Sequence, residues 1–251
     1  MTEGCPPECL GRPLEGVGNG VRRWMVASPA RETAPDDKTR RTGCPILSPA
    51  VMRLRGTGVR VRRLAGMLIR EAAAADWPGI WAVMEPTVRA GETYTFPVDS
   101  TGESMRAAWL PATPATPAAS AHDAGTSPRM TRTYVVTEET GGESPPMIVA
   151  TAQLHPNFPG AGSRIANASF MVHPDHEGKG YGRLLAHHVL DSARADGYRG
   201  MQFNAVVESN TGAVYLWESL GFDIMTTIPN AFDHPVLGPV GLHIMFKALT
   251  G

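Results

Sequence analysis

The sequence is poor in cysteine, and its three cysteines (Cys5, Cys9 and Cys44) all lie near the N-terminus. An odd number of cysteines without paired spacing provides no disulfide framework. A single C-x3-C pair without further ligands is not a zinc site. We therefore expect a protein without structural disulfides and without a bound metal.

Long apolar runs are also absent. No stretch approaches the roughly 20 apolar residues that a membrane-spanning helix needs. The N-terminus lacks the apolar core of a signal peptide. These absences predict a cytoplasmic protein that has no membrane partner.

A strong excess of one charge is missing too, because the formal net charge of the 251 residues is −1. The charges are nevertheless unevenly divided. Residues 1–66 contain 12 Lys and Arg against 6 Asp and Glu, and residues 67–251 contain 11 against 18. A basic, proline- and glycine-rich head on an acidic body indicates an appended tail and argues against a nucleic-acid partner. Since residues 1–66 show no sustained period of 2 or 3.6, we expect a disordered N-terminal extension, with Met67 as a candidate translation start.

The body begins with an expected strand at 67–70. Asp76 is expected to cap a helix over 77–84, which Pro86 ends or kinks before a short helix to residue 90. A loop over 91–97 follows, and Ser100 with Glu103 forms an expected capping box for a helix over 101–110. Residues 111–128 are of low complexity and are expected to form a surface insertion.

Strands dominate the rest of the chain, and two helices interrupt them. The strands are expected at 132–138, 147–154, 166–173, 201–207, 222–228 and 241–247. The helices are expected at 181–195 and 210–220, ended by Gly197 and Gly221. The apolar residues of 181–195 fall within one arc of about 140°, whereas His187 and His188 lie outside it and are expected at the surface.

Alternating glycines join the strand at 166–173 to the helix that follows. The run reads Glu177-Gly178-Lys179-Gly180-Tyr181-Gly182-Arg183. Glycines let the backbone approach a ligand, and the first N–H groups of a helix attract anions. The run therefore predicts a phosphate cradle, with Lys179 and Arg183 adding positive charge. Neither a Walker G-K-[ST] nor a dinucleotide G-x-G-x-x-G spacing is present.

Amide side chains form a stripe on two neighbouring strands. By alternation, Asn167 shares a face with Ser169 and Met171, and Gln202 shares one with Asn204 and Val206. Buried amides need hydrogen-bond partners. Two interpretations stay open: Asn167, Gln202 and Asn204 satisfy one another, or they bind a substrate.

The glycine run resembles the coenzyme A pyrophosphate loop of the Gcn5-related N-acetyltransferases, written [RQ]-G-x-G-x-[GA], with Glu177 in place of Arg or Gln. The element order is similar to that family's α/β (α+β) fold, a mixed central sheet with helices on both faces, over residues 67–249. The resemblance implies acetyl-CoA as the acetyl donor, with its thioester arm along the backbone of 170–172 and a wedge where the next strand splays away. The implied coenzyme-binding residues are Met171, Val172, Gly178, Lys179, Gly180, Tyr181, Gly182, Arg183 and Asn210.

Three segments over about residues 147–245 resemble one branch of this family, that of the fungal L-azetidine-2-carboxylate N-acetyltransferases. They are 167–170, 203–210 and 217–222. That branch acetylates toxic proline analogues. The resemblance implies catalytic and substrate-binding roles for Asn167 and Asn204, and Gln202 is assigned to substrate binding beside them. The expected substrate is a small amino compound, either a proline analogue or another amino acid, and the expected assembly is a monomer or a homodimer.

Trp217 is a second departure from the family pattern. Many relatives have a tyrosine there as a candidate acid for the leaving thiolate, whereas an indole N–H is no acid near neutral pH. We therefore expect Trp217 to serve in packing. The general base stays open among His155, His234 and Glu208. Glu177 and Trp217 also support an alternative function, a coenzyme A-binding regulatory module without turnover.

Overall fold

The computed structural model describes residues 51–53, 60–64, 66–110, 131–139 and 146–249. The expected insertion at 111–128 and most of the expected N-terminal extension lie outside these ranges. In the described part, no helix is long and apolar enough to cross a membrane.

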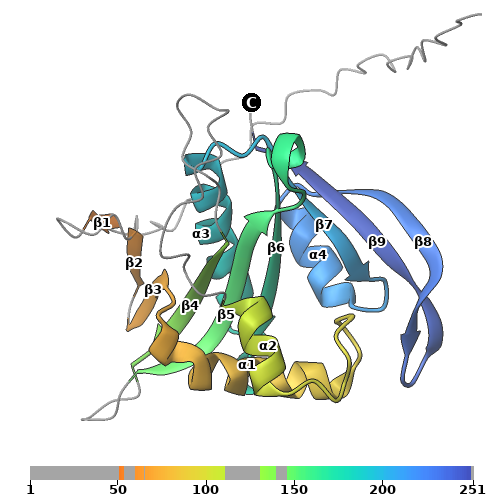
Figure 1. Cartoon of the computed structure of the whole chain (residues 1–251), viewed down its shortest axis with the longest axis horizontal. Coiled ribbons are helices and arrows are strands. Elements are labelled where there is room, and N and C mark those ends of the chain that lie inside the picture. Colours follow the sequence, from red (N-terminus) through yellow and green to blue (C-terminus); the bar gives the residue numbers. More distant parts are fainter. Residues whose placement is uncertain (1–50, 54–59, 65, 111–130, 140–145, 250–251) are drawn as a thin grey trace, which may run out of the picture. The chain divides into compact units, whose positions relative to one another are not determined.

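A single nine-stranded sheet organises the described residues, in the order β1-β2-β3-β4-β5-β6-β7-β9-β8 (Figure 1). Neighbouring strands are antiparallel except for β6 and β7, which are parallel. The strands are β1 (Val51–Arg53), β2 (Arg60–Leu64), β3 (Met67–Glu71), β4 (Arg132–Glu138), β5 (Met147–Pro156), β6 (Ile165–Val172), β7 (Gly200–Val207), β8 (Asp223–His234) and β9 (Gly238–Ala248).

Helices cover both faces of the sheet, as the fold prediction required. On one face, α1 (Trp77–Ala90) and α2 (Gly102–Trp109) bury side chains against Val135 and Met171. On the other face lies a larger core that includes buried residues of α3 (Tyr181–Ala195) and α4 (Thr211–Ser219). The mixed α/β fold class is therefore confirmed.

Helix α1 corrects the prediction that Pro86 ends the helix, because it continues through this proline to Ala90. Pro86 is exposed, so the carbonyl that it leaves unpaired, at the exposed Ala82, can bind water. Val83, Met84 and Val88 are buried on the opposite side and hold both halves of the helix to the sheet. Packing thus outweighs the local cost of the proline.

The cap predictions for α1 and α2 need correction as well. Asp76 occupies the N-cap position of α1, but its side chain makes no cap hydrogen bond there. It accepts instead from the backbone N–H of Ala73 and from Arg70. The capping box of α2 is formed by Thr101 and Ser104, one residue later than the expected Ser100 and Glu103.

Two strands occur where the sequence pattern predicted no regular structure. β1 and β2 extend the sheet beyond β3 by antiparallel pairing, with Leu64 opposite Met67. Strand β8 is also longer than expected, since it runs to His234 rather than to Ile228. The other strands agree with their predicted ranges to within three residues.

Helix α3 has its predicted bounds but a wider buried face. His188 is buried, with its ring 5.0 Å from that of Tyr134 in an edge-on contact, so the expectation that it lies at the surface is wrong. Tyr181 and Ser192 on the same flank are also buried. His187 is exposed as expected. After the helix, Gly197 adopts φ 73°, as predicted for the residue that ends it.

Candidate active site between β6 and β7

The two parallel strands of the sheet touch only at their start. Ile165 pairs with Gly200 and Ala166 with Met201, and no further pairs join β6 to β7. Beyond this point the strands diverge (Figure 1). A cavity of about 300 Å³ lies at the opening. It is lined by β6 and β7, by α4 and by the loop between α1 and α2, so the wedge expected from the resemblance is present.

A bulge in β7 faces this cavity. Phe203 pairs with Met245 of β9 and Val206 pairs with His243, so Asn204 and Ala205 together oppose one residue. The extra residue reverses the alternation, and Val206 joins Phe203 in the core. The prediction that Val206 shares a face with Gln202 and Asn204 is therefore wrong. As a result, the exposed Asn204 and Ala205 line the cavity.

Four amide side chains form a hydrogen-bonded network beside the bulge. Asn204 Nδ2 donates to Asn157 Oδ1 at 2.7 Å, and Asn167 Nδ2 donates to the same oxygen at 3.2 Å. Gln202 Nε2 donates to Asn204 Oδ1 at 2.8 Å. These amides therefore bond one another, as the first interpretation expected, with Asn157 Oδ1 as the acceptor that Asn167 and Asn204 share.

Asn157 was missed by the sequence analysis. It follows β5, which pairs with β6 so that His155 lies opposite Asn167. This pairing register places Asn157 next to the amide stripe, and the sequence alone does not reveal it. Its Nδ2 is buried and has no hydrogen-bond partner among the described residues. An unpaired buried donor is costly. Asn157 and Gln202 lie outside the lining of the cavity, whereas Asn167 and Asn204 line it, so the first pair reaches the cavity only through the second.

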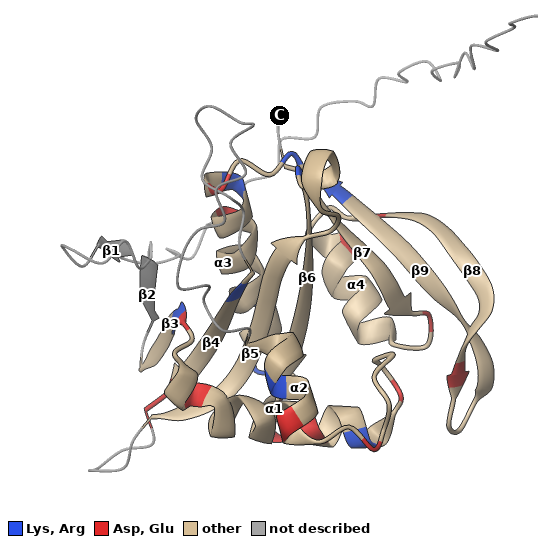
Figure 2. Cartoon of the chain, in the orientation of Figure 1, with Lys and Arg blue, Asp and Glu red and all other residues tan. Residues whose placement is uncertain are grey.

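Among the described residues that line the cavity, none carries a charge. The ribbon at the facing parts of β6 and β7 is correspondingly uncharged in Figure 2. The three base candidates lie outside the lining and have structural contacts. Glu208 Oε2 accepts from Gly241 N at 2.9 Å, His155 Nδ1 lies 2.8 Å from Pro156 O, and His234 Nδ1 accepts from the β8–β9 turn.

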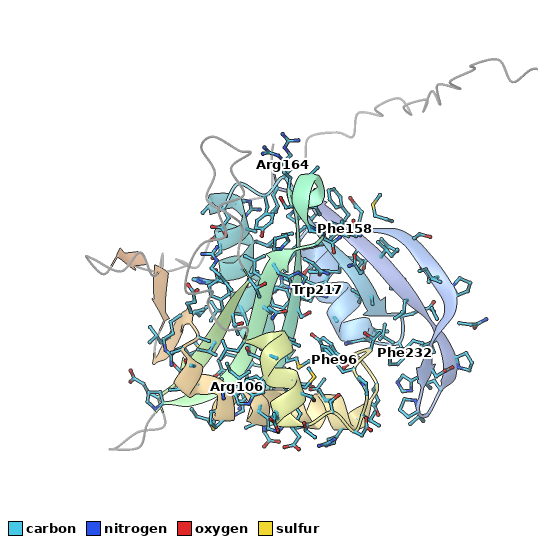
Figure 3. The ribbon with its side chains drawn as sticks, viewed as in Figure 1. Phe96, Arg106, Phe158, Arg164, Trp217 and Phe232 are labelled. Carbon is cyan, nitrogen blue, oxygen red and sulfur yellow. The ribbon has the colours of Figure 1, made fainter. Side chains whose placement is uncertain are left out.

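Aromatic side chains form the wall of the cavity on the α4 side. Trp217 is buried, with its ring 4.9 Å from Phe170 and 4.7 Å from Phe203. Phe222 stacks on Phe203. Figure 3 shows Trp217 on α4, and Phe96 on the loop that follows α1. The expectation that Trp217 serves in packing is confirmed.

Tyr94 is the second residue that the sequence analysis missed. It lies in the loop between α1 and α2 and lines the cavity. Its hydroxyl donates to Phe170 O at 2.5 Å and accepts from Phe170 N at 3.0 Å. Burial raises the pKa of the Tyr94 phenol, and the hydrogen bond to Phe170 only partly opposes this rise. Tyr94 is therefore a neutral donor throughout the neutral pH range.

The glycine run forms an exposed turn at the end of β6 and leads directly into α3. Gly178 and Gly180 have φ values of 72° and 86°, which glycine tolerates best, and a Cβ at either position would meet no atom within 4 Å. The backbone is thus open to a ligand. Lys179 lies in the turn, whereas Arg183 donates to Ser219 Oγ at 2.8 Å and connects α3 to α4.

The other predicted coenzyme-binding residues offer mainly backbone groups. Met171 is buried against α1 and α2, and Val172 packs toward α3 and α4, so their side chains belong to the core. The Tyr181 side chain is buried and packs near His176. Asn210 lines the cavity, but its Oδ1 caps α4 by accepting from Ala213 N at 3.1 Å, which leaves its amide N–H groups for a ligand.

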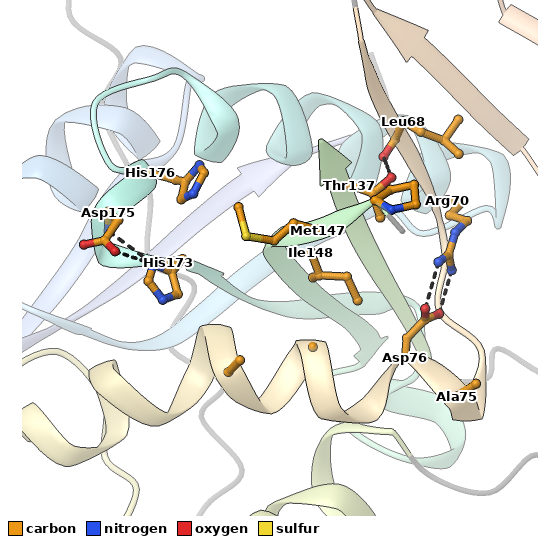
Figure 4. A pocket seen from close by; sticks show the side chains of 13 residues that line it. Leu68, Arg70, Ala75, Asp76, Thr137, Met147, Ile148, His173, Asp175 and His176 are labelled. Atoms are coloured by element: carbon orange, nitrogen blue, oxygen red, sulfur yellow. Dashed lines mark hydrogen bonds and ion pairs between the residues drawn. The ribbon is translucent and has the colours of Figure 1, made fainter. Parts of the chain in front are cut away.

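A second and larger cavity, of about 740 Å³, lies among β3, β4, β5, α1 and the segment before the glycine turn (Figure 4). Several of its polar groups already have partners. Arg70 and Asp76 form two hydrogen bonds of 2.6 and 2.8 Å, and His173 Nδ1 accepts from the Asp175 backbone N–H at 3.2 Å. The cavity between β6 and β7 is smaller, but it combines an unpaired strand edge with the amide network. The chemistry therefore favours the smaller cavity as the candidate active site.

Comparison with known proteins agrees with this geometry. The acetyltransferase (GNAT) family pattern matches residues 100–222. The structure of a GCN5-related N-acetyltransferase from Kribbella flavida is 40% identical with a TM-score of 0.63, and the match covers 73% of this chain and 98% of that one. The structure of yncA from Salmonella typhimurium, solved with its cofactor acetyl-CoA, is 22% identical with a TM-score of 0.55, and the match covers 74% and 96%.

Two curated relatives match shorter segments. N-acetyltransferase aca1 of Schizosaccharomyces pombe is 42% identical over 69 residues, which are 28% of this chain and 33% of the relative. The L-amino acid N-acyltransferase MnaT of Escherichia coli is 38% identical over 61 residues, 24% of this chain and 35% of the relative. The chain thus spans about a third of the length of the curated relatives that it matches. On the nearly complete match to the Kribbella flavida structure, the chain belongs to the GCN5-related N-acetyltransferase family.

Proposed function

We propose that this protein transfers an acetyl group from acetyl-CoA to the amino group of a small compound, with a proline analogue or another amino acid as the substrate. One observation carries the proposal. The strand that diverges from its parallel neighbour, β6, also leads into the open glycine turn at the start of α3. A single ligand can therefore extend along the strand edge and place its phosphates at the turn.

The acetyl donor is bound mainly by backbone groups in this proposal. The turn at Gly178, Lys179 and Gly180 receives the pyrophosphate, because the first N–H groups of α3 are unpaired and favour anions. Lys179 adds charge there. Met171 and Val172 contribute their backbone along the thioester arm, and Asn210 contributes its amide. Tyr181, Gly182 and Arg183 shape the first turn of α3.

The amine substrate is held by the amide network. Asn167, Asn204 and Gln202 are neutral donors, and Asn157 adds a buried N–H group without a partner in the described part of the chain. Several amide donors suit a carboxylate, which needs hydrogen bonds when it leaves water. The name of MnaT, an L-amino acid N-acyltransferase, supports a substrate of this class. The wedge between the strands brings the amine to the acetyl carbon.

Proton transfer is assigned to water in this mechanism, because the described lining contains no ionisable acid or base that titrates near neutrality. Asn204 is unable to act as a base, so its catalytic role is to hold the substrate in attack geometry. Trp217 excludes water behind the thioester.

A second candidate function is a coenzyme A-binding module that regulates without turnover. Glu177 in the glycine turn, Trp217 at the wall and the uncharged lining favour it. The two functions differ in one measurable property, because only an enzyme releases free coenzyme A in proportion to added amine.

A screen of amino acids and proline analogues, read by free-thiol release from acetyl-CoA, tests the proposal. We expect amine-dependent release with at least one carboxylate-bearing amine, and weak release with the matching amine that lacks the carboxylate. Tight acetyl-CoA binding without release for any amine would favour the regulatory module. Absence of both binding and release would contradict both functions.

A further inference from the structure

The Tyr94 hydroxyl forms hydrogen bonds with the backbone N–H and C=O of Phe170, at the edge of β6. Within one residue of an antiparallel strand, the N–H and C=O point to the same neighbour. Phe170 lies opposite Ala152 of β5, yet both of its backbone groups bond Tyr94. They therefore point away from β5 and into the opening toward β7. Since β6 and β7 pair only at Ile165 and Ala166, no strand reaches these two groups.

The loop holds Tyr94 in this position through aromatic contacts. The ring stacks on Phe96 at 5.5 Å with an interplanar angle of 4°, and Phe96 packs edge-on against Trp109 at 6.5 Å. Trp109 is buried and fixed by a hydrogen bond to Thr151. The hydroxyl thus projects from a supported row of rings. It bonds to the N–H and the C=O of Phe170, which an extended ligand with an amide or thioester would otherwise bond.

From this geometry we infer that Tyr94 is a catalytic residue whose hydroxyl alternates between two hydrogen-bonding positions. This inference rests on the proposed function. Without the acetyl donor, the Tyr94 hydroxyl occupies the Phe170 backbone groups. When the donor binds, the thioester carbonyl oxygen takes the hydroxyl's place at Phe170 N–H. The displaced Tyr94 O–H then donates to that same oxygen, so that two donors hold it.

This pair of donors matches the charge that the reaction develops. The amine nitrogen forms a bond to the acetyl carbon, and the carbonyl electron pair moves to oxygen, which becomes negative. The pair then returns, the carbon–sulfur bond breaks and its electrons leave with sulfur. The proton that nitrogen loses to water balances the one that the coenzyme A thiolate takes up. Tyr94 gives up no proton in this sequence, which agrees with its raised pKa. Its hydrogen bond strengthens as the oxygen becomes negative.

Tyr94→Phe tests the inference, because it removes the hydroxyl and keeps the ring that stacks on Phe96. Two effects of opposite direction are expected. Acetyl-CoA binding, measured by calorimetry without amine, should tighten about two- to tenfold, because the variant loses two competing hydrogen bonds to Phe170 in the free protein and only one hydrogen bond, to the neutral and weakly accepting thioester oxygen, in the complex. Turnover at saturating substrates should fall about 100-fold, because one oxyanion donor is lost. Tyr215→Phe, which removes a hydroxyl from an exposed ring outside the cavity lining, is the matched control and should change neither quantity.

The two readouts separate failure of this inference from failure of the proposed function. An active wild-type enzyme whose Tyr94→Phe variant turns over normally would overturn the catalytic role. Unchanged or weaker acetyl-CoA binding by the variant would overturn the displacement. If the wild type releases no thiol with any amine, the proposed function fails and the catalytic role fails with it, and the binding comparison still decides whether the hydroxyl competes with the donor.

Discussion

At the scale of single residues, Asn204 belongs both to the amide network and to the β7 bulge. We predict that Asn204→Ala lowers turnover by about 100- to 1000-fold, because the substrate loses a donor that positions it. Acetyl-CoA affinity should stay nearly constant. Since Asn204 is exposed, its loss should lower the free energy of unfolding by no more than about 1 kcal/mol.

Melting temperature and turnover measured on the same preparations distinguish this role from a structural one. If Asn204 only held Gln202 and Asn157 in place, its alanine variant would melt earlier and the folded fraction would retain normal specific activity. Asn204→Asp provides a further comparison. It should be less active than the alanine variant, because a negative charge repels both a carboxylate and a developing oxyanion.

Asp76 provides a prediction about pH. Hydrogen bonds from Arg70 lower the pKa of its carboxyl group, with a smaller contribution from Ala73 N–H, whereas burial opposes the shift. A carboxyl group with a lowered pKa stabilises the folded state fully above its ordinary pKa of about 4. The stabilisation is lost as the pH falls through the folded-state pKa.

We therefore expect Asp76→Asn to lower the free energy of unfolding at pH 7 by about 1–2 kcal/mol. The difference from wild type should shrink as the pH falls below about 4. Thermal melts over this pH range provide the measurement. Glu85→Gln is the control, because Glu85 pairs with Arg89 at 3.4 Å on the surface, where an ion pair contributes little. A pH-independent difference for Asp76→Asn would contradict the charge argument.

Residue-scale prediction from sequence succeeded for side chains on the regular strand β6, and failed for Val206, for His188 and for the contact partners. Alternation correctly placed Asn167 and Met171 on one face of β6, since it depends only on the strand period. The partners Asn157 and Tyr94 come from a loop after β5 and a loop after α1, which the fold brings together across many residues of sequence. Neither loop has a repeating pattern that would report this contact.

At the scale of elements, the glycine turn carries the proposed phosphate site. We predict that Gly180→Asp weakens acetyl-CoA binding at least about tenfold, because it places a negative charge where the pyrophosphate lies. Gly238→Asp is a matched control. Gly238 also has a positive φ, 75°, with open space around its Cβ position, but it is the first residue of β9, next to the β8–β9 turn.

Both variants place the same new charge on a residue with a positive φ, so a difference in affinity between them reports the phosphate site. Calorimetric titration with acetyl-CoA measures it, and circular dichroism checks that each variant is folded. Equal affinities for wild type and Gly180→Asp would refute the assignment of the turn.

Elements whose stability is local were predicted well, and those governed by packing were not. Helix α3 and strand β4 have their predicted bounds because periodicity and end signals agree there. Helix α1 passes through Pro86 because buried residues on both sides of the proline hold it. The β7 bulge depends on the register against β9, which the β7 sequence alone does not reveal.

At the scale of the whole molecule, the catalytic machinery is proposed to lie within residues 67–249. We predict that a chain beginning at Met67 folds and binds acetyl-CoA with unchanged affinity, because the described residues of both core clusters lie within this range. Its melting temperature should fall by a few degrees, since β3 loses the pairing with β2 and becomes an edge strand.

Size-exclusion chromatography and calorimetry on the shortened chain provide the test. A soluble protein with wild-type affinity is the expected outcome. Loss of soluble protein would contradict the prediction and would show that part of residues 1–66 is required for folding.

The short parallel contact between β6 and β7 also has a mechanical consequence. Backbone hydrogen bonds join the sheet continuously from β1 to β6 and from β7 to β8, but only two residue pairs join these halves. Most of the resistance to bending along this seam must therefore come from side chains such as Phe170, Phe203 and Trp217. A ligand that bonds to the edge of β6 and also contacts β7 would join the two halves of the sheet across this seam. It would raise the rigidity of the protein most where the reaction takes place.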